Sequence, residues 1–236
     1  MRLVVTAGDR DGAYQGVLQI EPKRGWITYW REPGDSGIPP EVSVKPGSPF
    51  TIAGIDFPVP KRIDNGPVRD LGYDAPVTLP LTLQGPPHGE GGRLEAHVFI
   101  GICENICIPF TADFALDVSG DVEGEDALMI ASARTRLPEK PSPAFRVAKA
   151  GRLADGKALS VDLVLPAAPA GDLQVFVTGP TGDFAMEYRT LKTEANGASL
   201  EIPLARLPEA GDPEGKTWRL LAISGGRAME TPLAFD

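Results

Sequence analysis

The chain has 236 residues, of which 42% are hydrophobic, a share that allows an ordinary buried core and excludes a disordered chain. Its formal net charge is −9 and no basic cluster occurs in it, so nucleic acid and an anionic membrane surface are not expected as partners. No segment approaches the roughly 18 apolar residues that span a bilayer, so this fragment is not expected to insert into a membrane.

The first 120 residues contain short apolar runs separated by turn residues, a pattern typical of an all-β domain. Met1 leads directly into polar sequence without a signal peptide, so we expect a fragment of a longer precursor, with a cytoplasmic protein as the alternative. Pro80 lies inside one run and predicts an edge strand or a bulge there. The strands expected in this part cover residues 13–20, 26–30, 50–55, 77–83, 93–102 and 111–118.

The last two of these runs alternate apolar and polar residues, and we predict that they are the arms of a hairpin. One face of the first arm is apolar and carries Leu94, Ala96, Val98, Ile100 and Ile102. In the second arm the expected inward residues are Phe114, Leu116 and Val118, and the expected outward residues are Asp113 and Asp117. The connection between the arms is the segment 103–109, CENICIP.

The composition changes after residue 120, and residues 121–144 are expected to form a linker between two domains. Asp126 is predicted to cap a short helix that ends at about Arg134, and a stiff proline-rich segment follows it. Residues 145–236 return to a β pattern, with the pairs Asn196-Gly197 and Gly225-Gly226 as hairpin turns. We therefore predict an all-β chain with domains at 1–120 and 145–236, and we find no catalytic constellation in the second domain.

The chain has two cysteines, Cys103 and Cys107, and both lie in the predicted hairpin connection. Four positions of extended strand span about 13 Å, whereas a disulfide needs Cα atoms within roughly 7 Å. The chain must therefore turn between the cysteines if they bond. A structural bond across so small a loop contributes only about 2 kcal/mol, which favours redox chemistry, although a structural bond and a metal site stay open as alternatives.

Two cysteines on one short exposed loop suit thiol–disulfide exchange, because one thiolate attacks a partner disulfide and the second thiol resolves the mixed disulfide. The motif differs from that of thioredoxin, which has two intervening residues at the start of a helix. Glu104 beside Cys103 opposes thiolate formation, so we expect a domain that passes electrons on after being reduced.

At these residues the sequence resembles the N-terminal periplasmic domain of the DsbD and ScsB family of transmembrane thiol reductases, with ScsB as the nearer branch. The order and spacing of several segments carry the resemblance over about residues 25 to 118. They are 28–37 (TYWREPGDSG), Pro39-Pro40, 57–62 (FPVPKR), Gly72-Tyr73, 77–81 (VTLPL) and 103–109 (CENICIP).

The resemblance implies an immunoglobulin-like β-sandwich that carries the redox pair, and we expect two such sandwiches joined by the linker. It implies a periplasmic protein-disulfide reductase domain that needs no cofactor. Electrons would come from transmembrane and thioredoxin-like domains of the same full-length protein. They would pass to thioredoxin-like periplasmic partners of the ScsC or DsbC kind. By position, Cys103 and Cys107 match the family's two cysteines, and Cys107 matches the one that engages the partner.

The sequence departs from the DsbD pattern at two places. DsbD-like members have five residues between the cysteines, and this chain has three. They also shield the pair with a loop that carries an aromatic residue, whereas the corresponding stretch here, Asp64 to Asp70, has none. Tyr73 is interpreted either as a residue near the site or as a core tyrosine.

The other candidates have simpler interpretations. His97 is expected on the strand surface and His88 in a solvent-facing turn, while residues 35–36 have the composition of a turn. Trp26, Tyr29 and Trp30 are interpreted as core and sheet-face aromatics. Two further functions stay open: a Cu(I)-binding or copper-tolerance module that uses both thiolates, and a passive binding module with an incidental disulfide.

Overall fold

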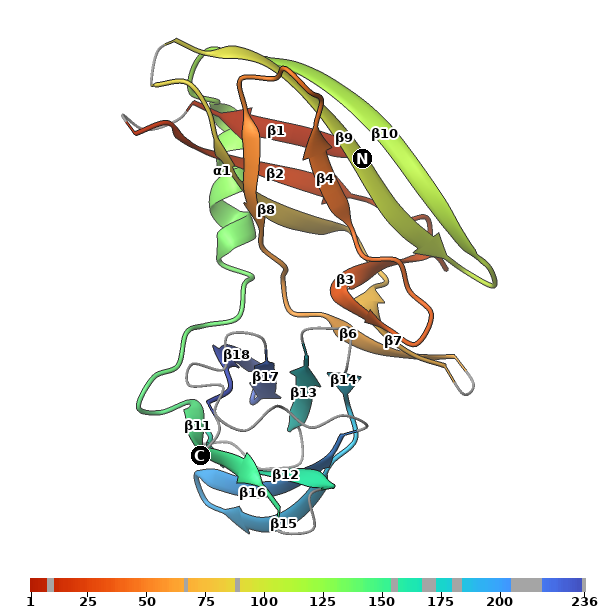
Figure 1. The fold of residues 1–236 in the computed structure, drawn as a ribbon, viewed down its shortest axis with the longest axis vertical. Helices are drawn as coiled ribbons and strands as arrows, with labels where there is room; N and C mark the ends of the chain where they lie inside the picture. The colour runs from red at the N-terminus through yellow and green to blue at the C-terminus, as the bar shows by residue number, and fades with distance from the viewer. Residues whose placement is uncertain are drawn as a thin grey trace. The chain divides into compact units, whose positions relative to one another are not determined.

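The computed structural model describes residues 1–7, 11–65, 68–87, 90–153, 157–166, 173–179, 184–204 and 218–234. It contains two compact units, Met1–Leu137 and Pro138–Asp236, each built from antiparallel sheets (Figure 1). The prediction of an all-β, immunoglobulin-like fold is confirmed. No helix in the described part of the chain is long and apolar enough to cross a membrane.

The first unit consists of two sheets with a core between them. The four-stranded sheet has the order β1 (Arg2–Thr6), β2 (Ala13–Ile20), β8 (Val77–Gln84) and β5 (Thr51–Ile55). The second sheet has the order β10 (Cys107–Val118), β9 (Gly92–Cys103), β3 (Ile27–Gly34), β7 (Val68–Tyr73) and β6 (Lys61–Asn65), and β4 (Glu41–Val44) also pairs with β9. Strands β1, β4, β6 and β7 were not predicted from the sequence.

Alternate residues of β9 are apolar and buried, and they form one side of the core. Leu94, Ala96, Val98 and Ile100 are at most 1% exposed, as predicted, while Ile102 near the strand end is half-buried. On β10 the predicted inward residues Phe114 and Leu116 are half-buried and Val118 is buried. The two strands pair along their whole length, so the predicted hairpin is confirmed.

The edge-strand prediction for Pro80 is wrong, because β8 lies between β2 and β5. The carbonyl of Pro80 accepts a hydrogen bond from the Asp56 amide, just past the end of β5, at 2.8 Å. Since the N and O atoms of one strand residue point to the same side, the missing amide hydrogen of Pro80 faces the end of the β5 ladder. The irregularity in pairing that a proline in a central strand calls for lies on the neighbouring strand β5, where the register with β8 shifts between Ile52 and Gly54.

Helix α1 (Gly124–Arg134) packs on the first unit. Its buried residues Ile130 and Ala133 contact Val4 and Val17 of the four-stranded sheet. The predicted cap at Asp126 is wrong: Glu123 is the N-cap residue and makes no side-chain cap bond. Because the helix buries an apolar face, the first compact unit extends through Leu137 rather than ending at residue 120.

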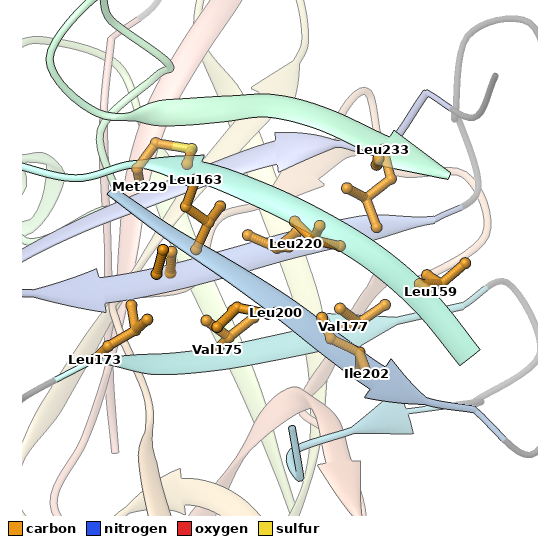
Figure 2. Close-up of a cluster of buried hydrophobic side chains, with 14 of the residues drawn as sticks. Leu159, Leu163, Leu173, Val175, Val177, Leu200, Ile202, Leu220, Met229 and Leu233 are labelled. Atoms are coloured by element: carbon orange, nitrogen blue, oxygen red, sulfur yellow. The ribbon is translucent and has the colours of Figure 1, made fainter. Parts of the chain in front are cut away.

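The second unit begins with the proline-rich segment and holds two four-stranded sheets. One sheet has the order β11 (Arg146–Arg152), β12 (Ala158–Val164), β16 (Gly197–Pro203) and β15 (Arg189–Glu194). The other has the order β14 (Phe184–Ala185), β13 (Gln174–Thr178), β17 (Arg219–Ser224) and β18 (Arg227–Pro232). Their facing side chains form one apolar core, part of which is shown in Figure 2. The successive strands β14 and β15 belong to different sheets. Both predicted hairpins of this half are present, as β15–β16 and β17–β18.

Candidate functional site

The β9–β10 hairpin positions the two cysteines at its end. Cys103 is the last residue of β9, Cys107 is the first of β10, and the two are directly opposed in the ladder. Their Cα atoms are 4.2 Å apart and their sulfurs form a disulfide. The turn required by the sequence is thus the three-residue tip 104–106, at the free end of the long hairpin in Figure 1.

The two cysteines differ in exposure. Cys103 is 9% exposed, whereas Cys107 is half-exposed. All three tip residues are exposed, and Ile106 is 74% exposed. A molecule that approaches the tip therefore reaches Cys107 more readily than Cys103.

Tyr29 on β3 contacts the disulfide. Its hydroxyl lies 3.0 Å from Cys107 Sγ, and it is the donor because a disulfide sulfur carries no proton. Burial and, secondarily, the negative charge of Asp70 raise the pKa of Tyr29 to about 12, while the Ser36 side chain lowers it by less. The hydroxyl consequently keeps its proton at neutral pH and stays available as a donor to sulfur.

Two glycines leave room for the Tyr29 ring. A Cβ atom at Gly37 would lie 2.4 Å from the ring's Cδ1 atom. A Cβ atom at Gly101 would lie 3.0 Å from Cδ2 and 2.7 Å from the Cβ atom of Ile38. The segment around Gly37 and Ile38 thus packs closely over β9, and the Gly101 amide donates to the Ile38 carbonyl at 3.3 Å.

A buried carboxylate fixes this segment to the sheet. Asp70 on β7 is 5% exposed and accepts hydrogen bonds from the Ser36 amide at 3.1 Å and the Ser36 hydroxyl at 2.9 Å. Asp35 accepts from the Arg69 amide at 2.9 Å. The residues predicted to make a local turn therefore bond across to a neighbouring strand. They connect Asp70 to the residues that surround Tyr29.

The other candidates have other bonding partners or lie outside the described residues. Tyr73 is 7% exposed and donates to the Pro58 carbonyl, which agrees with its interpretation as a core tyrosine. His97 is half-exposed in mid-strand, as expected, with Nδ1 3.0 Å from an Asp113 oxygen. His88 lies outside the described residues. Within the described ranges no group of three or more His, Cys, Asp or Glu side chains is arranged to hold a metal ion.

The sequence interpretation missed the role of Tyr29. The expected core position of Tyr29 agrees with its full burial, but its hydroxyl also reaches the disulfide. One sequence signal for this contact was available. Gly101 lies inside a strand, and a glycine in that position often marks a place where another group approaches the strand closely. Nothing in the local sequence around Asp70 indicates that it bonds to Ser36.

Comparisons with known proteins agree with this geometry. Residues 3–119 match the family described as "Thiol:disulfide interchange protein DsbD, N-terminal". The structure is similar to that of the N-terminal periplasmic domain of ScsB from Proteus mirabilis, with 19% sequence identity, a TM-score of 0.77, and coverage of 98% of this chain and 91% of that chain. At that identity the likeness shows the fold alone.

A second similarity, to the CupB2 chaperone of Pseudomonas aeruginosa, has 10% identity, 93% coverage of both chains and a TM-score of 0.25, too low to carry an argument. No curated protein sequence matches the chain. The resemblance inferred from the sequence is confirmed for the matched residues. They form a thiol–disulfide interchange domain of the DsbD N-terminal family, and its two cysteines pair as a disulfide.

Proposed function

We propose that this DsbD-type N-terminal domain is a periplasmic protein-disulfide reductase domain that relays electrons through Cys103 and Cys107. The electrons would come from transmembrane and thioredoxin-like domains of the same full-length protein. They would pass to thioredoxin-like periplasmic partners of the ScsC or DsbC kind. The observation that carries the proposal is a disulfide at the exposed end of a hairpin, with a protonated tyrosine hydroxyl on one of its sulfurs.

The disulfide form is the oxidised state of the proposed cycle. Two electrons and two protons from an upstream dithiol convert it to two thiols, and the upstream dithiol becomes a disulfide. The Cys107 thiolate then attacks the partner disulfide, so that one partner sulfur leaves as a thiolate and a mixed disulfide forms. The Cys103 thiolate attacks Cys107 Sγ and releases the second partner thiolate. The pair is again oxidised, and the partner has gained two electrons.

The difference in exposure supports Cys107 as the sulfur that engages the partner. An attacking thiolate must reach a sulfur on another protein, and Cys107 is the more exposed of the two residues. Cys103 needs to reach only Cys107, which lies directly across the ladder. Burial of Cys103 therefore does not hinder its proposed role as the resolving thiol.

Tyr29 supports the same assignment. Its hydroxyl lies 3.0 Å from Cys107 Sγ, the atom that carries the negative charge when Cys107 is a thiolate. A hydrogen bond to a charged acceptor is stronger than one to a neutral acceptor. The hydroxyl therefore stabilises the Cys107 thiolate more than it stabilises the disulfide. We assign Tyr29 as a positioning and stabilising residue and Cys107 as the nucleophile.

Trapping tests the assignment. The Cys103→Ala variant keeps the nucleophile but lacks the resolving thiol, so it is expected to accumulate a mixed disulfide with an oxidised thioredoxin-like partner of the DsbC kind. The Cys107→Ala variant is the matched control and should accumulate little. If the control traps as much partner as Cys103→Ala, or if neither variant traps any, the roles proposed here are wrong.

A redox titration of the wild-type pair against glutathione separates the relay from a structural bond. A relay pair is expected to equilibrate with the buffer, whereas a potential below about −300 mV indicates a structural disulfide. The Cu(I) alternative stays a prediction. Competition for Cu(I) by the reduced protein tests it, and tight stoichiometric binding would favour it.

A further inference from the structure

Three exposed apolar side chains of the first unit lie near its cysteine pair. Six large hydrophobic residues are exposed in the described part of the chain, and three of them, Ile106, Ile108 and Phe110, lie within four residues of Cys107. They are 74%, 43% and 46% exposed. A soluble domain has no reason to place three such side chains together in water unless another surface covers them.

An apolar groove of about 310 Å³ adjoins these residues. Phe110, Ile100 and Ile102 form its hairpin side, and Ile20, Pro22 and Trp26 line it from β2 and the segment that follows. Phe110 is opposite Ile100 in the ladder, and Ile108 is opposite Ile102. Because neighbouring strand residues point to opposite faces, the groove is on one face of the hairpin and the disulfide on the other.

The edge of the hairpin gives access to both faces. Strand β10 is the terminal strand of its sheet, with β9 as its pairing partner. Phe110 lies three residues from Cys107, about 10 Å along the strand. A partner whose sulfur meets Cys107 covers about 800 Å² in a standard interface, a patch that extends beyond Phe110. Of the side chains that line the groove, those of Glu21 and Lys23 are charged, and their charges are opposite, while the others are apolar.

We propose that this groove binds an apolar side chain next to the reactive cysteine of the thioredoxin-like partner. The inference rests on the proposed redox function and adds a specificity determinant to it. The disulfide face carries out the exchange, while the groove face selects partners whose cysteine has apolar neighbours. Phe110 and Ile108 are specificity residues in this arrangement and do not touch the reacting sulfurs.

Two synthetic peptides test the groove with the wild-type protein. Each has one central cysteine, flanked by leucines in the first peptide and by serines in the second. A peptide thiolate attacks Cys107 Sγ and Cys103 leaves as a thiolate. A second peptide thiolate then releases Cys107, which gives one peptide disulfide and the reduced pair. The leucine peptide is expected to reduce the protein about tenfold faster, because partial burial of a leucine removes tens of Å² of apolar surface from water.

Variants locate the effect. Phe110→Ala should remove most of the difference between the peptides, and Ile108→Ala serves as the second variant. Leu128→Ala is the matched control, since Leu128 is 71% exposed on helix α1, and it should keep the difference. Circular dichroism spectra confirm that each variant is folded.

Each outcome has a distinct meaning. Equal rates for the two peptides, or a difference that persists in Phe110→Ala, overturn the groove proposal and leave the redox function standing. A wild-type protein that sediments as a dimer, and as a monomer after Phe110→Ala, also overturns it, because a second copy then fills the groove. If neither peptide nor dithiothreitol opens the disulfide reversibly, the proposed function itself is wrong.

Discussion

The Tyr29→Phe substitution removes one hydroxyl from the site and leaves the ring in place. In the disulfide form it removes a hydrogen bond to a neutral sulfur, for which we expect a stability loss of about 1 kcal/mol or less. In the reduced form it removes a donor to the Cys107 thiolate, and bonds to charged groups contribute about 1.5–3 kcal/mol. Since Cys107 is half-exposed, we take the lower end of that range.

That lower end corresponds to about a tenfold change in the thiol–thiolate equilibrium. Tyr29→Phe is therefore expected to raise the pKa of the Cys107 thiol and to leave about tenfold fewer thiolates at neutral pH. Because the pKa of Tyr29 is raised to about 12, the wild-type hydroxyl remains a donor throughout the titration of a thiol.

The assay uses the Cys103→Ala background, in which Cys107 is the single thiol. The rate of alkylation by iodoacetamide, measured across pH, gives the pKa of that thiol with and without the Tyr29 hydroxyl. Tyr73→Phe is the matched control, because the Tyr73 hydroxyl is also buried but donates to the backbone carbonyl of Pro58. The argument fails if Tyr29→Phe and Tyr73→Phe give the same thiol pKa.

Three further results follow from the geometry. The unfolded chain ionises Tyr29 near its ordinary pKa of 10.0, while the folded protein holds the proton to about 12, so alkaline denaturation should show a stability loss of up to about 3 kcal/mol that Tyr29→Phe abolishes. Gly37→Ala places a Cβ atom 2.4 Å from the Tyr29 ring and should destabilise the first unit by about 1–3 kcal/mol; Gly54→Ala, which meets no atom within 4 Å, should not. Reduction of the disulfide should lower the free energy of unfolding by about 2 kcal/mol at most, and the first unit should remain folded in circular dichroism.

The hairpin was predictable because its two arms alternate and only a short segment joins them. Alternation also identified the inward face of β9, where sequence period and burial coincide. Strand β4 could not be found in this way, since it has four residues and its pairing partner β9 is distant in sequence. Strand β6 has only five residues, too few for a clear alternating pattern, although its pairing partner β7 follows it directly. Short strands are defined by tertiary contacts rather than by local pattern.

The pairing of Cys103 with Cys107 was predictable from the sequence, whereas the surroundings of the disulfide were not. Tyr29 has the pattern of any buried strand aromatic, and nothing local states which buried hydroxyl will reach a sulfur 78 positions away. Asp70 and Ser36 are separated by 34 positions and meet only when β7 lies beside β3. These contacts depend on sheet order, which periodicity does not supply.

Twelve opposed residue pairs hold β9 against β10, and the hairpin needs no sulfur–sulfur bond to keep its shape. After reduction the two thiols therefore stay on adjacent chain ends. Each thiol meets the other at an effective concentration far above that of any second molecule. Attack of Cys103 on the mixed disulfide at Cys107 is then faster than attack by free thiols from solution, so the covalent complex with a partner is short-lived. In the proposed relay, turnover would then be limited by how often partners encounter the domain rather than by the lifetime of the mixed disulfide.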